Sequence, residues 1–187
     1  MGTDQKTDEM MKFTALPALA LLYACTSDRP AAELAFVDVA PLNGNFQVTF
    51  QSNVQFFELF SKNRHQRPVL SQLACSLEAD SNLEFEHRLE YFGKGGVEVA
   101  ARPVESGAYR FQSALQFWRA SEDGMGSDQM LTNAELAAVL QGRKTIPCIV
   151  RMTIYLSQPY YTKTMHVSVE RILAAMPNES EVLPNAR

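Results

Sequence analysis

Apolar and charged residues alternate along residues 83–91, LEFEHRLEY, more regularly than anywhere else in the chain. Beginning with Leu83, every second side chain is apolar, aromatic or histidine, and the residues between them are all charged. A period of two is typical of an antiparallel strand that has one face on the core and the other in water. We therefore predict a half-buried β-strand over residues 83–91.

A β-hairpin is predicted nearer the N-terminus. Residues 34–42 and 45–52 flank Asn43-Gly44, a dipeptide that favours a tight two-residue turn. The second arm alternates apolar and polar residues, as a half-buried strand does. Pro41 indicates that the first arm is an edge strand or ends early, because proline cannot donate a hydrogen bond to a neighbouring strand.

Several other segments have the composition of strands. They lie at residues 69–79, 97–101, 108–118, 148–156 and 160–173. The GKGG sequence of residues 93–96 predicts a turn between two of these strands. Residues 54–60, VQFFELF, fit either a strand or one short helix, and the pattern does not decide between them.

One helix is predicted after Thr132. Glu135 follows that threonine by three residues, which is the spacing of a capping box, and Gly142 supplies a stop. A parallel sheet would need a helix between most strands, and this sequence has one convincing helix. The predicted fold is therefore mainly β: an antiparallel β-sandwich, immunoglobulin-like, with one short helix in a crossover.

Composition limits the classes of function. The chain has 187 residues, of which 46% are hydrophobic and 20% charged, as expected for one globular domain. The formal net charge is −4, and no cluster of lysine and arginine provides the basic face that nucleic acid requires. We predict a folded domain at residues 33–176, a flexible tail at 177–187, and no nucleic-acid partner.

The N-terminal region has the anatomy of a secretory signal. Lys12 precedes an apolar run at residues 13–23, which is shorter than the roughly 18 residues that a membrane-spanning helix needs. The run ends in Leu22-Tyr23-Ala24-Cys25, which resembles the lipobox of bacterial lipoproteins. The resemblance implies a signal peptide at residues 1–24, a lipid on Cys25 and a tether at 25–32. Because Thr26 is not acidic, it also implies anchoring to the outer membrane, with the domain facing the periplasm.

Two alternatives remain for this region. Cys25 could instead be a buried thiol in a first helix, although Pro17 would interrupt that helix. The opening MGTDQKTDE is acidic and a poor beginning for a signal, so we hypothesise that translation starts at Met10 or Met11. Mass spectrometry of the native N-terminus distinguishes the starts, because a peptide that contains Met1 excludes the later ones.

The other two of the three cysteines are predicted to form a disulfide. Cys75 and Cys148 each lie in a strand-like segment, on the apolar face. An oxidising periplasm would allow them to pair. The alternative is two separate buried thiols. Neither cysteine has a second ligand at a spacing that suits a metal, so we predict no metal site.

The sequence contains no pattern that indicates catalysis. It has no G-x-S-x-G and no H-E-x-x-H motif. Of the three histidines, His65 lies in a basic loop, His87 is on the apolar face of its predicted strand, and His166 is predicted to face solvent. We predict that the protein is not an enzyme and has no cofactor.

Two loops are candidates for binding a partner. Residues 121–129 are rich in glycine and acidic residues, and the sequence QPYYTK carries two adjacent tyrosines, a residue type enriched at interfaces. The predicted partner-binding residues are Glu122, Asp123, Asp128, Tyr160 and Tyr161. The alternative is a solvated loop and ordinary strand packing.

The leading hypothesis is a lipid-anchored module that binds another protein. Residues 146–169, IPCIVRMTIYLSQPYYTKTMHVSV, resemble lipoproteins that confer immunity to type VI secretion effectors. That resemblance implies steric blocking of a toxic effector such as a lipase. The alternative is a structural lipoprotein of an envelope-assembly or secretion apparatus. A carrier of a small ligand is a third hypothesis, and it requires a pocket.

Overall fold

The computed structural model describes residues 29–60, 68–79, 81–100, 107–121, 126–154 and 158–176. One compact unit begins at Ala31. The predictions for the signal peptide, for Cys25 and for the C-terminal tail lie outside the described residues. So do the candidate partner-binding residues Glu122 and Asp123.

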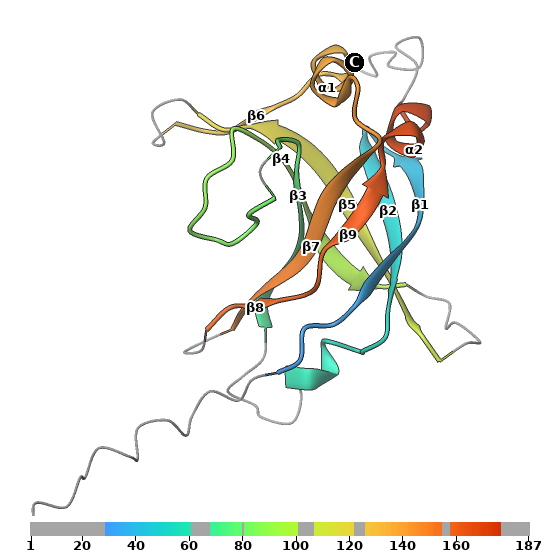
Figure 1. Ribbon diagram of the computed structural model, residues 1–187, viewed down its shortest axis with the longest axis vertical. Coiled ribbons are helices and arrows are strands. Elements are labelled where there is room, and N and C mark those ends of the chain that lie inside the picture. Colours follow the sequence, from blue (N-terminus) through green and yellow to red (C-terminus); the bar gives the residue numbers. More distant parts are fainter. Residues whose placement is uncertain are drawn as a thin grey trace, which may run out of the picture. The chain divides into compact units, whose positions relative to one another are not determined.

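The fold is mainly β and antiparallel, as predicted, and its described strands form a single nine-stranded sheet (Figure 1). The strands along the main path have the order β1-β2-β5-β4-β3-β7-β8, while β6 pairs with β5 and β9 pairs with β7. The strands are β1 (Leu34–Leu42), β2 (Asn45–Ser52), β3 (Pro68–Ser76), β4 (Tyr91–Val99), β5 (Tyr109–Arg119), β6 (Gln129–Met130), β7 (Thr145–Ile154), β8 (Tyr160–Tyr161) and β9 (Met165–Ser168).

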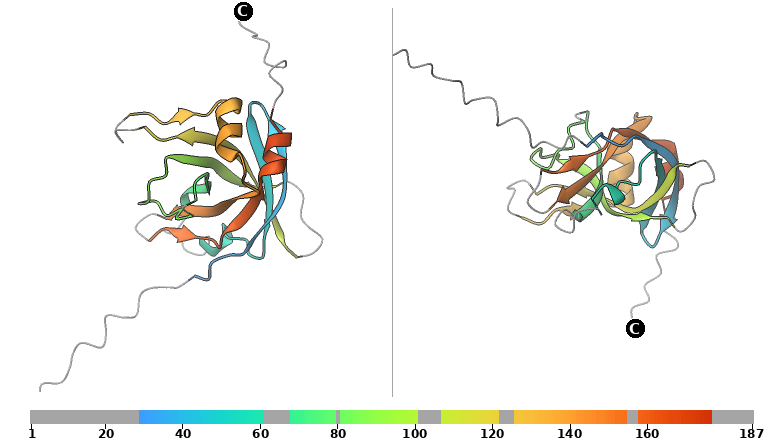
Figure 2. Two further views of the ribbon diagram at one scale, coloured as in Figure 1. Left: turned by 45° about the horizontal axis from the view of Figure 1, so that its top comes forward. Right: turned by 90° about the horizontal axis from the view of Figure 1, so that it is seen from below.

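The sheet folds over one main core. Strand β5 pairs with β2 on one side and with β4 on the other, so it belongs to both halves of the sheet. Strand β9, which pairs with β7 off the main path, packs beside β1 (Figure 2). Buried side chains from both halves therefore meet in one cluster. This arrangement is consistent with the predicted sandwich of immunoglobulin-like type.

Alternate residues of the central strands supply the core, as their sequence pattern predicts. On β5, Phe111, Leu115 and Phe117 are buried. The ring of Phe111 stacks on that of Phe56, with centroids 4.0 Å apart. Phe56 precedes a 3-10 helix at Glu58–Phe60, so the segment 54–60 ends in a short helix rather than continuing as a strand.

The predicted hairpin is confirmed. β1 and β2 pair from Leu34↔Ser52 to Leu42↔Asn45, and the turn between them is Asn43-Gly44. Both turn residues have positive φ, 45° and 82°. This is the conformation that two-residue hairpin turns demand and that asparagine and glycine tolerate best.

The predicted helix is also confirmed, as α1 (Asn133–Leu140). The Glu135 N–H donates to the Thr132 hydroxyl oxygen at 3.3 Å, and the Thr132 N–H donates to the Glu135 carboxylate at 2.9 Å. The Thr132 N–H, and the Thr132 hydroxyl that donates to the same carboxylate at 2.8 Å, hold the pKa of Glu135 below its usual range, because both hydrogen bonds favour the charged carboxylate. Gly142 follows the helix with a φ of 78°.

We expect Thr132→Ala to lower the free energy of unfolding by about 1 kcal/mol, because the Glu135 N–H loses its acceptor. Urea denaturation of the purified chain measures the change. Thr164→Ala is the matched control, because Thr164 is exposed and lies outside every strand and helix. Equal losses for the two variants would show that the capping box does not stabilise the fold.

A second helix, α2 (Val169–Ala174), lies where the sequence predicts the end of a strand. The prediction is wrong beyond residue 168. The Ser168 hydroxyl accepts a hydrogen bond from the Arg171 N–H at 3.4 Å and caps the helix. Val169 and Ile172 are then on the same helical face, and both are buried in the main core.

The strand predicted at residues 83–91 does not exist. Residues 81–90 form no strand, and β4 begins only at Tyr91. The alternation is nevertheless real in the burial: Leu83 and Leu89 are buried, and the charged residues between them are exposed. The two leucines pack with Ala74 and Ile149 in a second, smaller cluster. Because β3 is already paired on both sides, by β4 and β7, the segment has no strand to pair with there.

The turn predicted at residues 93–96 is also wrong, because these residues lie inside β4. The glycines allow close approach of strands instead of reversing the chain. A Cβ on Gly93 would lie 2.9 Å from the Phe117 ring, and one on Gly95 would lie 2.4 Å from the Ala114 carbonyl oxygen. Glycine inside a strand often marks such a contact.

Candidate binding site

Cys75 and Cys148 form a disulfide, as predicted. They are opposite each other in the register of β3 and β7, and neither side chain is exposed. The bridge therefore joins two neighbouring strands of the same sheet. Cys75 also lines a pocket, together with Ala74, Leu83 and Leu89 of the smaller hydrophobic cluster.

Tyr160, one of the predicted partner-binding residues, lies in the core. Its side chain is 6% exposed, and its ring packs edge-on against Phe60 with centroids 5.5 Å apart. Its hydroxyl accepts a hydrogen bond from the Ala32 N–H at 2.8 Å. Tyrosine is common both at interfaces and in cores where its hydroxyl finds a partner, and the sequence pattern does not distinguish the two.

The Tyr161 side chain points to the opposite face of β8 from Tyr160 and contacts the segment 81–90. It is half-buried beside the smaller hydrophobic cluster. Its hydroxyl accepts from the Phe85 N–H at 3.3 Å, and the two rings lie with centroids 6.0 Å apart. Tyr161 thus holds one wall of the pocket in place.

Asp128, the described acidic residue of the candidate loop, is fixed to the sheet. Its carboxylate pairs with the Lys94 ammonium group at 2.9 Å. That ammonium group lies over the rings of Phe92 and Trp118, 5.1 Å and 4.8 Å from their centroids. Cation–π contacts of this kind restrict the lysine to one position, so the carboxylate it holds is also positioned.

The other end of the same loop is joined to the segment 81–90. The Arg88 guanidinium group donates a hydrogen bond to the Ser121 carbonyl oxygen. The acidic loop is therefore held at Ser121 by one cation and at Asp128 by another.

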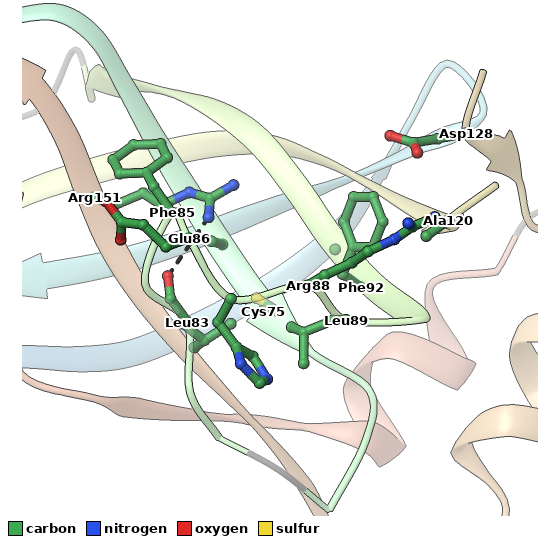
Figure 3. Close-up of a pocket in the computed structure, with 13 residues that line it drawn as sticks. Cys75, Leu83, Phe85, Glu86, Arg88, Leu89, Phe92, Ala120, Asp128 and Arg151 are labelled. Carbon is green, nitrogen blue, oxygen red and sulfur yellow. Dashed lines mark hydrogen bonds between the residues drawn. The ribbon is translucent and has the colours of Figure 1, made fainter. Parts of the chain in front are cut away.

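The pocket has a volume of about 230 Å³ (Figure 3). Ala74, Cys75 and Gly93 of β3 and β4 line it on the sheet side. The segment 81–90 lines the opposite side, and Ala120 and Asp128 lie at its end near the acidic loop. Figure 3 shows Arg151, Phe85 and Glu86 at one end and Arg88, Phe92 and Ala120 at the other.

Arg151 is held in the pocket by hydrogen bonds and by an aromatic ring. Its Nε and Nη2 donate to the Gln72 side-chain oxygen at 3.1 Å and 2.8 Å. Its guanidinium carbon lies 4.4 Å from the centroid of the Phe85 ring. Burial lowers the pKa of Arg151, and the nearby Tyr161 opposes this shift. The group remains a cation at neutral pH, because arginine does not deprotonate in proteins.

Neither Arg151 nor Arg88 was predicted as a site residue from the sequence. A signal existed for Arg151: it is a cation in the apolar strand CIVRMTIYL, and it faces away from Cys148, Val150 and Met152. Such a residue is expected on an outer face. Only the segment 81–90, which covers that face, converts it from a solvated side chain into a pocket residue.

Within the described ranges, no three histidine, cysteine or carboxylate side chains come together as metal ligands. No helix in the described part of the chain has the length and apolar character to cross a membrane. No family model, curated protein or solved structure matches this chain. The geometry of the pocket and of the two loops is therefore the basis for assigning a function.

Proposed function

We propose that this chain is a periplasm-facing, lipid-anchored protein that binds another protein through the acidic loop 121–129 and the adjoining segment 81–90. The version we favour is an immunity protein that neutralises a toxic effector, such as a type VI secretion lipase, by covering its active site. The observation that carries the proposal is the anchoring of the loop at both ends, by Arg88 at Ser121 and by Lys94 at Asp128.

Anchoring of this kind favours binding for a physical reason. A loop with fixed ends loses less conformational freedom when it docks, so more of the interaction energy contributes to affinity. The acidic residues Glu122 and Asp123 also attract a basic partner and speed its encounter. The Cys75–Cys148 disulfide supports a location in an oxidising compartment.

A competition assay between sister cells tests the proposal. We expect deletion of this gene to make cells sensitive to attack by their unaltered sisters, and the wild-type gene to restore resistance. The double variant Glu122→Gln, Asp123→Asn should restore it poorly, because it removes two charges from the loop. The double variant Glu98→Gln, Glu170→Gln removes the same charge from β4 and α2 and should restore resistance fully.

Full resistance of the deletion strain would contradict the immunity role. Pull-down from solubilised envelopes then tests the alternative, since a structural lipoprotein should return components of an assembly or secretion apparatus instead of a soluble toxin. Labelling with radioactive palmitate tests the anchor: the label should appear on the wild-type protein and be absent from Cys25→Ser.

A further inference from the structure

We propose that the pocket beneath residues 81–90 binds a monocarboxylate, with the carboxylate on Arg151 and an apolar body against Leu89 and Phe92. The proposal does not depend on the function proposed above. It rests on three features of the pocket: the hydrogen-bond donors of Arg151 that the described residues do not use, the apolar lining side chains, and the net charge of the charged lining side chains.

Arg151 has hydrogen-bond donors available for a ligand. A guanidinium group carries five N–H donors. Three of them are used, two by the Gln72 side-chain oxygen and one by the Leu83 carbonyl oxygen at 3.5 Å. No carboxylate of the described residues forms an ion pair with Arg151. The two remaining donors lie on different nitrogens, which suits the two oxygens of a carboxylate.

The guanidinium group is also held ready for a ligand. Gln72 restrains it from one side, and the Phe85 ring lies against its face. A restrained donor loses little rotational freedom when it binds, and partial burial strengthens its attraction for an anion. Burial is unfavourable for an unpaired cation, so an anionic ligand would relieve that cost.

The pocket is small, and part of its lining is apolar. Leu83, Leu89 and Phe92 supply apolar side chains to it. Its volume of about 230 Å³ is below the roughly 300–1,000 Å³ of pockets for drug-sized ligands. These dimensions suit a body the size of a phenyl ring or a branched alkyl group.

The charge balance favours a ligand with a single negative charge. Arg88 and Arg151 line the pocket together with Glu86 and Asp128. Asp128 is already paired with Lys94, which leaves one net positive charge when His87 is neutral. A doubly charged phosphate would exceed that charge and meet repulsion from the two carboxylates, whereas a carboxylate matches it.

Titration of the full chain with benzoate and with benzamide, followed by two-dimensional ¹H–¹⁵N NMR, tests the proposal. The two probes have nearly the same shape and differ in charge. We expect benzoate to shift the amide signals of residues 83–93 and Arg151, and benzamide to bind about tenfold more weakly or worse. Equal binding of the two probes, or no shifts with benzoate, would overturn the proposal without any need for a variant.

Substitutions then test the role of Arg151. Arg151→Lys keeps the cation but loses the fork of donors, so we expect benzoate to bind about tenfold more weakly. Arg171→Lys, on α2, is the matched control and should leave the Kd unchanged. Thermal unfolding of each variant verifies that it is folded. A folded Arg151→Lys variant that binds benzoate as tightly as the wild type would overturn the assignment of Arg151.

A carboxylate can come from a free organic acid or from an acidic side chain of a protein partner. N-acetylglutamate N-methylamide carries the same group on a blocked residue and distinguishes the two sources. Tighter binding of benzoate indicates a free acid, and tighter binding of the blocked glutamate indicates a partner's side chain. If the blocked glutamate binds no better than its glutamine counterpart, a side-chain source is excluded.

Discussion

Replacing Cys75 and Cys148 together by alanine is expected to lower the free energy of unfolding by roughly 4 kcal/mol. The disulfide joins residues 73 positions apart, and such a cross-link strongly restricts the unfolded chain. Both side chains are fully buried, so the loss of the two sulfur atoms also leaves small voids in the sheet. Guanidinium denaturation of the purified chain under non-reducing conditions measures the effect.

The cysteine that is not part of the bridge provides the control. Cys25→Ser leaves the Cys75–Cys148 pair intact and should unfold at the same denaturant concentration as the wild type. Adding a reductant during denaturation should bring the wild type close to the double alanine variant. If reduction leaves the wild-type midpoint unchanged, the disulfide does not contribute to stability and its support for an oxidising compartment is lost.

Gly95→Ala is expected to destabilise the protein by about 3 kcal/mol, at the upper end of the usual cost of overpacking. A Cβ at this position would lie 2.4 Å from the Ala114 carbonyl oxygen and 2.6 Å from the Ser113 hydroxyl oxygen. The nearest atom belongs to the backbone of β5, so a rotamer change cannot relieve the contact. Thermal and urea denaturation both measure the loss.

The neighbouring glycine is the matched control. A Cβ on Gly96 meets no atom within 4 Å, and the residue is exposed. Gly96→Ala should therefore change stability by less than about 0.5 kcal/mol, and can raise it, because alanine has less freedom in the unfolded chain. Similar losses for the two variants would show that the close approach of β4 and β5 is not what requires Gly95.

The predictions from sequence patterns were wrong where side-chain patterns do not reveal which backbone segments pair with one another. The alternation at residues 83–91 correctly predicts that Leu83 and Leu89 face inward. The strand that it predicts does not form, because strand formation also requires a free edge on another strand. The turn predicted at residues 93–96 was wrong for a related reason. Glycine permits a turn and also permits strands to approach closely, and the neighbouring residues do not reveal which of these two roles it has.

The candidate site was predictable only in part. The acidic loop can be recognised in the sequence, and Asp128 of that loop lines the pocket. The pocket itself is assembled from residues distant in the chain, among them Cys75, Leu89, Ala120 and Arg151. No local pattern brings these residues together, so Arg88 and Arg151 were missed, and the sequence could not show that the candidate interface residue Tyr160 is buried.

The sequence by itself determined the class of the fold, the hairpin at Asn43-Gly44 and the helix that Thr132 caps. Each of these depends on interactions between residues near one another in the chain: the two-residue period of a strand, a positive φ in a turn, and hydrogen bonds across one helical turn. Only the tertiary structure decided that residues 81–90 form no strand and which residues surround Arg151. Those depend on which strands pair and which surfaces remain uncovered, and both are set by contacts across the whole chain.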